Sequence, residues 1–573
     1  MRLFEPDSDS FDALVKQFQW NVPAKFNIAE AICSRHARNP ESADNTALIC
    51  VSEEDPDTSL RYSFRDLERQ SNRLAHILVK LGCKPGDRVA IVLPQQLETA
   101  LAHIASHKIG AVSLPLAVLF GADALQHRLL DSGASVVITC QHHLETLIGL
   151  TGVLPALHSI LVCDDTPDSG QVAAELPPSA NDPVIVQRLS DQLELLSIEA
   201  DRFDPVKTNA DDPACLIYTS GTTGPPKGAL LAHRSILGNL PGFELSLEFY
   251  PHPDDIFFTP ADWAWTGGLY DGLFPTLYYG KPIVGYRYRK FDPLDMLELL
   301  QRFGITCGFF PPTALKILRT VDSIESNYDL KLRAIMSGGE TLGSELTSWA
   351  RSSLGVALNE MYGQTEHNFT VGNCSSILPI KPGSMGRPYP GHRIEVMQSD
   401  GELAKPGEEG ELVANVHDAV HFLGYWQQTE ATNQKYTGEW FHTGDVGYKD
   451  EDGYLWFTGR KDDVITSSGY RIGPGEIEDC ILKHPAIAQV AVIGVSDPEG
   501  IRGDIVKAFV VLREGIDEAD ALADEIKLSV REQLSAHEYP REIEFIDALP
   551  LTVTGKVRRK ELRELNANRR RNS

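Results

Sequence analysis

The sequence lacks a long hydrophobic run and a recognisable secretion signal. No stretch of about 18 or more apolar residues occurs in its 573 residues, so we expect no membrane-spanning helix. The N-terminal segment MRLFEPDSDSFDALVKQ places acidic residues where a signal peptide needs an apolar core. We therefore expect a cytoplasmic protein, or one of the mitochondrial matrix if its source is eukaryotic.

The chain has fewer positively than negatively charged residues. The chain has 53 Lys and Arg residues against 80 Asp and Glu residues, which gives a net charge of −27. A surface of this sign repels nucleic-acid backbones and anionic lipid, so neither is an expected partner. An anionic ligand must instead be held by local hydrogen-bond donors.

Cysteine is present but never paired in the sequence. The nine cysteines show no C-x-x-C spacing, and their number is odd. This pattern argues against a zinc or dithiol motif and favours reduced thiols. None of them lies in a constellation typical of a nucleophile, so we expect buried, unreactive side chains.

The remaining composition is that of a large globular protein. With 42% hydrophobic and 23% charged residues, the chain is long enough for two or more packed domains. Helical spacing from Leu67 to Leu81 alternates with apolar runs, which indicates mostly parallel sheets covered by helices. The predicted strands are Arg88–Leu93, Ala111–Leu116, Ser135–Thr139, Ser159–Cys163 and Leu332–Met336.

The character of the sequence changes near residue 460. Apolar runs at 489–495, 507–512 and 542–546 flank a predicted helix over roughly 517–534. The predicted fold class is therefore α/β. We expect a large N-terminal domain (1–459) of mostly parallel, helix-covered sheets and a small α+β C-terminal domain (460–573), in a monomer or a homodimer.

The most distinctive segment is a loop rich in glycine and hydroxyl groups, YTSGTTGPPKG, at residues 218–228. Its glycines allow a ligand to approach the backbone, its hydroxyls are donors, and Lys227 adds positive charge. These features suit a polyphosphate, although the Walker pattern G-x-x-x-x-G-K-[ST] is absent. A plain hairpin loop is the competing interpretation. The candidate phosphate-binding residues are Thr219, Ser220, Gly221, Thr222, Thr223, Gly224 and Lys227.

This loop resembles the phosphate-binding motif of the adenylate-forming enzymes, which include acyl-CoA synthetases, luciferases and peptide-synthetase adenylation domains. Segments that resemble the other family motifs follow in the family's order: YGQTE at 362–366, WFHTGD at 440–445, GRKDD at 459–463, SSGYRIGPGE at 467–476 and LPLTVTGKV at 549–557. The resemblance covers roughly residues 64–562 and is greatest to the medium-chain acyl-CoA synthetases. It implies ATP and CoA as co-substrates, with Mg²⁺ as the metal.

The resemblance assigns roles to particular residues of the larger domain. It implies that Glu366 binds Mg²⁺, which prefers hard carboxylate oxygens, and that Thr365 contacts the α-phosphate. Asp445 and Arg460 are implied to bind the ribose hydroxyls. The other implied ATP-binding residues are Gly339, Glu340, Thr341, Tyr362, Gly363 and Gln364.

For the C-terminal part, the resemblance implies a catalytic lysine, a hinge and a CoA site. An ammonium group at Lys556 can reach both the carboxylate and the α-phosphate, where charge builds up. Asp462 matches the hinge about which the small domain of these enzymes rotates between two half-reactions. The implied CoA-binding residues are Ser468, Gly469, Tyr470, Arg471, Arg502 and Tyr539.

The acyl pocket is predicted from glycines. Acetate-specific relatives carry a tryptophan after the tyrosine of the Y-x-Q-T-E segment, whereas this chain has Gly363. Gly267 and Gly338 are expected beside the same space, with Trp265 and Thr266 on another wall. Room left by missing side chains would favour an apolar acyl group by about 0.8 kcal/mol per buried methylene. We therefore expect an acid longer or more branched than acetate, up to medium chain, or an aryl acid.

The implied reaction has two steps. A carboxylate attacks the α-phosphorus of ATP and releases pyrophosphate, and a thiol then attacks the acyl adenylate and releases AMP. We expect an AMP-forming acyl-CoA ligase. A carrier-protein-loading adenylating enzyme and an aryl-CoA ligase remain alternatives, and a luciferase-like oxygenase shares the motifs. A catalytically dead nucleotide sensor is disfavoured, because Lys556, Glu366 and Asp445 are all retained.

Overall fold

The computed structural model describes residues 2–6, 10–163, 184–219, 225–339, 342–461, 463, 465–467, 470–497, 504–516, 520–533, 539–552 and 555–572. The described residues form two compact units. The first unit comprises residues up to 380 together with 388–393 and 416–434, and the second comprises 381–387, 394–415 and the residues from 435 onward. The predicted division at residue 460 stays a prediction. Between residues 381 and 434 the chain passes into the second unit and returns to the first twice. From residue 435 onward it stays in the second unit.

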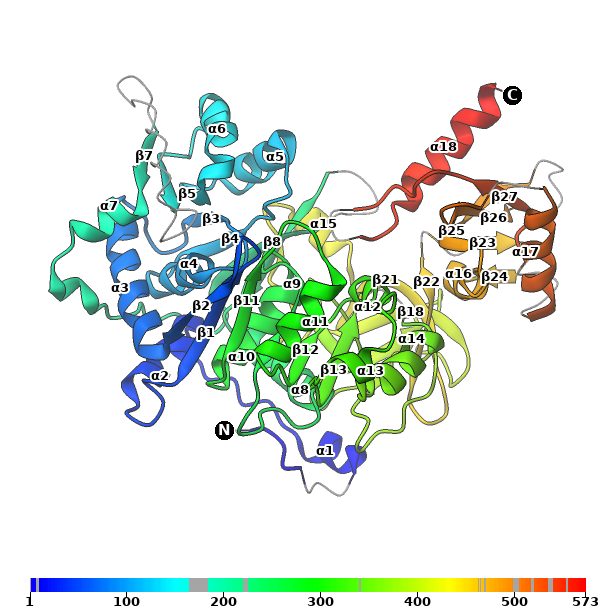
Figure 1. Cartoon of the computed structure of the whole chain (residues 1–573), viewed down its shortest axis with the longest axis horizontal. Helices are drawn as coiled ribbons and strands as arrows, with labels where there is room; N and C mark the ends of the chain where they lie inside the picture. The colour runs from blue at the N-terminus through cyan, green and yellow to red at the C-terminus, as the bar shows by residue number, and fades with distance from the viewer. Residues whose placement is uncertain are drawn as a thin grey trace. The chain divides into compact units, whose positions relative to one another are not determined.

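The first unit contains an eight-stranded sheet that is mostly parallel (Figure 1). Its strand order is β19-β9-β8-β4-β3-β5-β6-β7. The bounds are β3 Arg88–Val92, β4 Val112–Pro115, β5 Val136–Cys140, β6 Ser159–Cys163, β7 Ile185–Arg188, β8 Pro213–Thr219, β9 Lys227–Ala232 and β19 Gly424–Tyr425. Strands β8 and β9 form an antiparallel hairpin at one side of the parallel part.

A nine-stranded sheet completes the first unit, in the order β16-β15-β14-β13-β12-β10-β11-β1-β2. The bounds are β1 Thr46–Ser52, β2 Asp55–Ser63, β10 Phe257–Phe258, β11 Ile283–Arg287, β12 Cys307–Phe309, β13 Ala334–Gly338, β14 Leu358–Gln364, β15 His367–Gly372 and β16 Arg387–Pro388. The central strands from β1 to β14 are parallel, whereas β2 and β15 run antiparallel to their neighbours.

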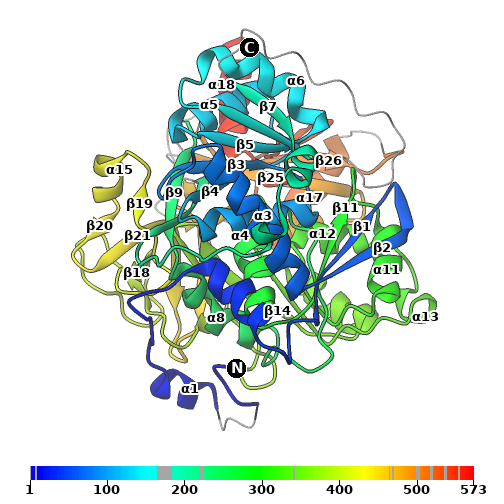
Figure 2. The same cartoon turned by 90° about the vertical axis from the view of Figure 1, so that its left-hand side faces the viewer.

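Helices cover both sheets. The main ones are α3 Phe64–Lys80, α4 Leu97–Lys108, α5 Ala122–Ser132, α6 Gln141–Leu150, α8 Ser235–Ser246, α11 Pro293–Arg302, α12 Pro312–Leu318 and α14 Ser344–Trp349. Helices α5 and α6 lie beside the sheet that contains β5 (Figure 2). Their leucines share a buried cluster with β5 and β6, and leucines of α11 and α12 share another with β13. Among the described residues, no helix is both long and apolar enough to cross a bilayer.

The second unit combines a five-stranded antiparallel sheet with smaller α+β elements. The sheet contains β17 Ile394–Met397, β18 Glu409–Asn415, β20 Tyr436–Thr437, β21 Trp440–Lys449 and β22 Leu455–Arg460. The later elements are β23 Ile465–Ser467, β24 Tyr470–Ile472, α16 Pro474–Leu482, β25 Ile487–Ser496, β26 Asp504–Leu512, α17 Asp520–Gln533, β27 Glu542–Phe545 and α18 Arg559–Asn572. Strands β25 and β26 share a separate apolar core with β23, β24 and helices α16 and α17.

The predicted mix of parallel sheets and covering helices is confirmed. Helix α3 begins after Ser63, whose side chain and that of Asp66 form a complete capping box. The helix ends at Lys80, with Leu81 as its C-cap. Gly82 follows in a left-handed conformation with φ of 92°. Eight of the nine cysteines are buried and Cys50 is half-buried, as expected for unpaired structural thiols.

Candidate active site

The predicted phosphate loop closes the hairpin of β8 and β9. Thr219 ends β8 and pairs with Lys227, which begins β9. Ser220, Gly221, Thr222, Thr223 and Gly224 lie outside the described residues. At the base of the hairpin, the Tyr218 hydroxyl donates to the Asp131 carboxylate over 2.6 Å. Burial and this carboxylate raise the pKa of Tyr218, so the phenol remains a donor.

The YGQTE segment forms a second hairpin. Gln364 at the end of β14 pairs with His367 at the start of β15, so Thr365 and Glu366 make the two-residue turn between the strands. Because β13 and β14 are parallel, Gly339 after β13 and this turn after β14 lie at the same edge of the sheet. Ligands of open α/β sheets bind at this carboxyl edge. Glu340 and Thr341 lie outside the described residues.

Glu366 is held by Tyr425, a residue that the sequence analysis did not single out. The Tyr425 hydroxyl donates to Glu366 Oε1 over 2.6 Å. Tyr425 lies on β19, which pairs with β9, the strand that begins at Lys227. The Lys227 ammonium is 5.3 Å from the centroid of the Tyr425 ring. One aromatic side chain therefore joins the phosphate-loop hairpin to the turn that carries Glu366.

The Glu366 carboxylate fits the predicted magnesium ligand. Its side chain is largely buried, and only Oε1 accepts a hydrogen bond from a described side chain. A carboxylate oxygen that stays available is what Mg²⁺ requires, since the ion takes few protein ligands besides phosphate and water. The residues present are therefore compatible with this ion.

The glycines of the predicted acyl pocket do not leave open space where a side chain would begin. A Cβ on Gly363 would lie 2.2 Å from the backbone nitrogen of Phe369, because the β14–β15 pairing bulges here. A Cβ on Gly267 would lie 2.7 Å from the Phe309 ring, and one on Gly338 would lie 2.3 Å from the Met361 carbonyl oxygen. A Cβ added at any of these glycines would therefore clash with neighbouring chain. That they widen the acyl pocket stays a prediction.

Trp265 and Thr266, predicted to form a wall of the acyl pocket, lie at the start of a short helix. Trp265 precedes the short helix α9 (Thr266–Gly268) and packs edge-on against Phe120, with ring centroids 5.8 Å apart. The guanidinium of Arg128 lies 4.0 Å from the centroid of the same Phe120 ring. Burial lowers the pKa of Arg128. Phe120 and Trp265 therefore form an aromatic pair with a buried cation beside it.

In the second unit, Asp445 and Arg460 face each other across β21 and β22. They are paired residues of the two strands, and an Arg460 nitrogen lies 2.7 Å from Asp445 Oδ1. Gly444 precedes Asp445 with φ of 77°, a conformation that favours glycine, and its N–H donates to Glu411. The two side chains predicted to bind ribose are therefore brought together.

Lys556 lies in a small hairpin that precedes helix α18 in the second unit. Leu551 bridges Val557, and the backbone N–H of Lys556 donates to Thr552 Oγ1 over 3.0 Å. Gly555 has φ of 85°, which permits the tight reversal just before the lysine. The backbone at this position is constrained, while the Lys556 residue is exposed.

The predicted hinge and CoA residues are described only in part. Asp462, Ser468, Gly469 and Arg502 lie outside the described residues. Tyr470 and Arg471 lie on β24, which pairs with β23. Tyr539 is flanked by two cations: the guanidinium carbons of Arg541 and Arg531 lie 4.4 and 5.8 Å from its ring centroid. These two arginines were not predicted.

Comparisons with known proteins agree with this geometry. The family model described as AMP-binding enzyme matches residues 34–426, and the model described as AMP-binding enzyme C-terminal domain matches 476–556. Acetyl-coenzyme A synthetase of Bacillus subtilis (strain 168) is 33% identical over 95% of this chain and 91% of its own length. Acyl-coenzyme A synthetase ACSM3, mitochondrial, of Rattus norvegicus is 31% identical over 97% of this chain and 93% of its own.

Among solved structures, the anthranilate CoA ligase AuaEII in complex with anthranoyl-AMP has a TM-score of 0.82 at 27% identity, over 95% of this chain and 98% of that chain. The first family model alone spans more than half of the sequence, and the relatives span nearly all of it. By sequence and by fold, the protein belongs to the AMP-binding enzyme family of adenylate-forming acyl-CoA ligases.

Proposed function

We propose that this protein is an AMP-forming ligase that joins a short-to-medium-chain or branched carboxylic acid to CoA. The observation that supports this most directly is the connection of Glu366, Tyr425 and Lys227 at the edge where β13 and β14 end. It places a carboxylate and an ammonium group around one position, as a polyphosphate with its metal requires.

The first half-reaction is attack of the acid carboxylate on the α-phosphorus of ATP, with pyrophosphate as the leaving group. Such a step depends on positioning of the reactants and neutralisation of the phosphate charge more than on a protein nucleophile. Lys227 and the phosphate loop would hold the phosphates, and Thr365 would donate to the α-phosphate. Lys556 would balance the charge that develops between the acid and that phosphate. Mg²⁺ held by Glu366 supplies further charge neutralisation when bound.

The remaining proposed roles concern the nucleotide and the thiol. Asp445 and Arg460 would bind the ribose, and Gly339, Tyr362 and Gln364 would line the adenine. In the second half-reaction the CoA thiol attacks the acyl carbonyl and expels AMP. The predicted CoA residues Tyr470, Arg471 and Tyr539 would act there, with Asp462 as the hinge. The guanidinium groups of Arg531 and Arg541 beside Tyr539 would bind the phosphate groups of CoA.

An aryl acid is the second candidate substrate. The structure that this chain resembles with a TM-score of 0.82 is named an anthranilate CoA ligase. Phe120, Trp265 and Phe309 gather around the predicted acyl wall, and aromatic side chains favour stacked or edge-on rings. The named acetyl-coenzyme A synthetase relative makes acetate the reference acid for any test.

The proposed function is tested by AMP release with MgATP and CoA over a panel of acids. The panel runs from acetate through isobutyrate, hexanoate and octanoate to benzoate and anthranilate, each with and without CoA. CoA-dependent release that peaks between isobutyrate and octanoate supports the proposal. A peak at benzoate or anthranilate supports the aryl candidate. Pyrophosphate release that CoA never accelerates points to a carrier-protein acceptor and contradicts both.

A further inference from the structure

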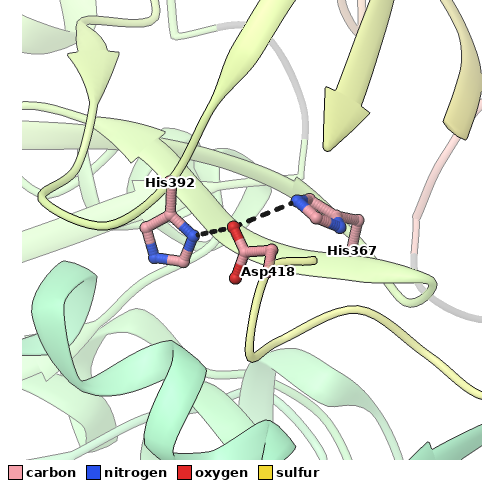
Figure 3. Close-up of side chains that lie close together, drawn as sticks. All are labelled: His367, His392 and Asp418. Carbon is pink, nitrogen blue, oxygen red and sulfur yellow. Dashed lines mark hydrogen bonds and ion pairs between the residues drawn. The ribbon is translucent and has the colours of Figure 1, made fainter. Parts of the chain in front are cut away.

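A second group of metal-ligating side chains lies next to the Glu366 turn. His367, His392 and Asp418 come from three separate segments of the first unit, and one donor atom of each lies within 4.8 Å of the others (Figure 3). Their side chains are 2%, 0% and 1% exposed. Burying three such groups together is costly unless a further partner pairs with them.

Both imidazoles face the same carboxylate oxygen. His392 Nδ1 lies 2.6 Å from Asp418 Oδ2, and His367 Nε2 lies 3.5 Å from it (Figure 3). The other carboxylate oxygen accepts from the backbone N–H of Val420 over 3.0 Å, which fixes the group. Apart from this 3.5 Å contact with the carboxylate, His367 Nε2 has no hydrogen-bond partner among the described residues, and neither does His392 Nε2.

His421 suits a ligand role for His367. The Nδ1 atoms of the two rings are 3.1 Å apart, so one of them carries the hydrogen that joins them. When His367 donates this hydrogen, its Nε2 presents a lone pair to Asp418. Metal-bound histidines are held in the same way, with the second ring nitrogen hydrogen bonded to a neighbour.

We propose that His367, His392 and Asp418 bind a divalent transition-metal ion, for which Zn²⁺ is the probe. Two imidazoles and one carboxylate suit such an ion, whereas Mg²⁺ prefers oxygen ligands alone. Tetrahedral ligands at about 2.0–2.1 Å from zinc lie about 3.4 Å from one another. The His367–Asp418 distance of 3.5 Å already meets this value, and the His392–Asp418 contact of 2.6 Å needs to open by under about 1 Å.

The cluster borders a route to solvent. Asp418 also lines a surface cavity of about 720 Å³ in the first unit, together with Trp20, Asp211, Asp212, Arg234 and His417. Arg234 is paired with Asp211 at 2.5 Å, so its charge is already balanced. The carboxylates of Asp211 and Asp212 would favour a cation that approaches the cluster from this cavity.

The bound ion would tie together three parts of the chain. His367 follows the turn that carries Glu366, whereas His392 and Asp418 lie in the two short stretches, 388–393 and 416–434, in which the chain returns to the first unit. A metal at this point would fix the returning stretches against the hairpin. The inference concerns a site separate from Glu366 and holds whatever acid the enzyme uses.

Metal binding by the full-length chain without nucleotide tests this proposal. After treatment with a chelator and its removal, we expect about one Zn²⁺ per chain in competition with a chromogenic indicator, as a three-ligand site predicts. Asp418→Asn and His392→Gln should each weaken Zn²⁺ binding at least tenfold. His417→Ala, at an exposed neighbouring histidine, should leave binding unchanged and controls for surface chelation.

Two further readouts keep the test decisive if a variant folds poorly. Co²⁺ in place of Zn²⁺ should give visible absorption bands of a low-coordinate nitrogen and oxygen site in the unaltered chain. Zn²⁺ should also raise the thermal unfolding midpoint of the unaltered chain but not that of His392→Gln. Binding well below one Zn²⁺ per unaltered chain, or equal affinity in the folded Asp418→Asn variant, would overturn the proposal.

Discussion

Glu366 and Lys556, the two charged side chains on which the proposed chemistry depends most, lie in opposite environments. Glu366 is buried at a strand turn and fixed by Tyr425, whereas Lys556 is exposed on a hairpin. A buried carboxylate loses little conformational entropy when it meets a metal, because its position is already set. The flexible stem of a lysine lets an exposed ammonium group move to the charge that it balances.

The difference predicts that the two residues fail in different ways when they are changed. Loss of the exposed group should remove activity and spare stability. Loss of the buried group or of its supports should affect both. The following variants test that contrast.

Lys556→Ala should have the largest effect on activity. Adenylate formation, measured as exchange of pyrophosphate into ATP, should fall by roughly 10²–10³-fold because charge at the α-phosphate is no longer balanced. Thioester formation from supplied acyl adenylate should be nearly unchanged, and the free energy of unfolding should change by less than about 0.5 kcal/mol. An equal loss in both half-reactions would contradict the assignment of Lys556 to the first one alone.

Glu366→Gln should lower adenylate formation by about 10²-fold and raise the Mg²⁺ concentration needed for half-maximal rate. Glutamine can still accept the Tyr425 hydrogen bond, so the fold is retained. The measurement is the rate as a function of Mg²⁺ at fixed ATP. A rate that falls with no change in its Mg²⁺ dependence would argue against Glu366 as a metal ligand.

Asp271→Asn tests how much the burial of a carboxyl group lowers the free energy of unfolding when its hydrogen-bond partners among the described residues are amides. Asp271 accepts hydrogen bonds from Asn239 and Asn368, and burial raises its pKa to about 8. The native state therefore holds a proton that the unfolded chain has lost above about pH 4, and this group makes stability fall as pH rises toward 8. The asparagine variant should remove a contribution on the order of 1 kcal/mol per pH unit.

This contribution is measured as the difference between the urea unfolding free energies of the two proteins at pH 5, 6, 7 and 8. The variant should gain stability relative to the unaltered chain as pH rises. Parallel profiles would show that Asp271 titrates normally.

Gly363→Ala should destabilise the fold by about 2–3 kcal/mol, since its Cβ would lie 2.2 Å from the backbone of Phe369. Gly149→Ala is the matched control. It lies inside α6 with nothing within 4 Å of the added Cβ, and it should stabilise the protein by up to about 1 kcal/mol. If Gly363→Ala kept full stability and only narrowed the acid range, the prediction that Gly363 opens the acyl pocket would be supported.

Tyr425→Phe should have the smallest effect, a loss of about 1 kcal/mol of stability from the hydrogen bond to Glu366. Combining it with Glu366→Gln in a double-mutant cycle measures how strongly the two residues are coupled. Additive effects would mean that Tyr425 does not hold Glu366 in place.

Much of the fold was predictable from local patterns. The helical spacing and capping residues of α3 and the buried strand Ser159–Cys163 follow from short stretches of sequence. Patterns of this kind depend on backbone and side-chain preferences within a few residues, so they can be recognised without the rest of the chain.

The family and the order of its motifs can be recognised from the sequence alone. The fold is needed to see that Tyr425 joins Glu366 across 59 residues, that Phe369 fills the space beside Gly363, and that His367, His392 and Asp418 meet. Each of these contacts depends on which distant segments pack together, since hydrogen bonds and clashes are set by distances of a few ångströms. No spacing in the chain encodes such distances.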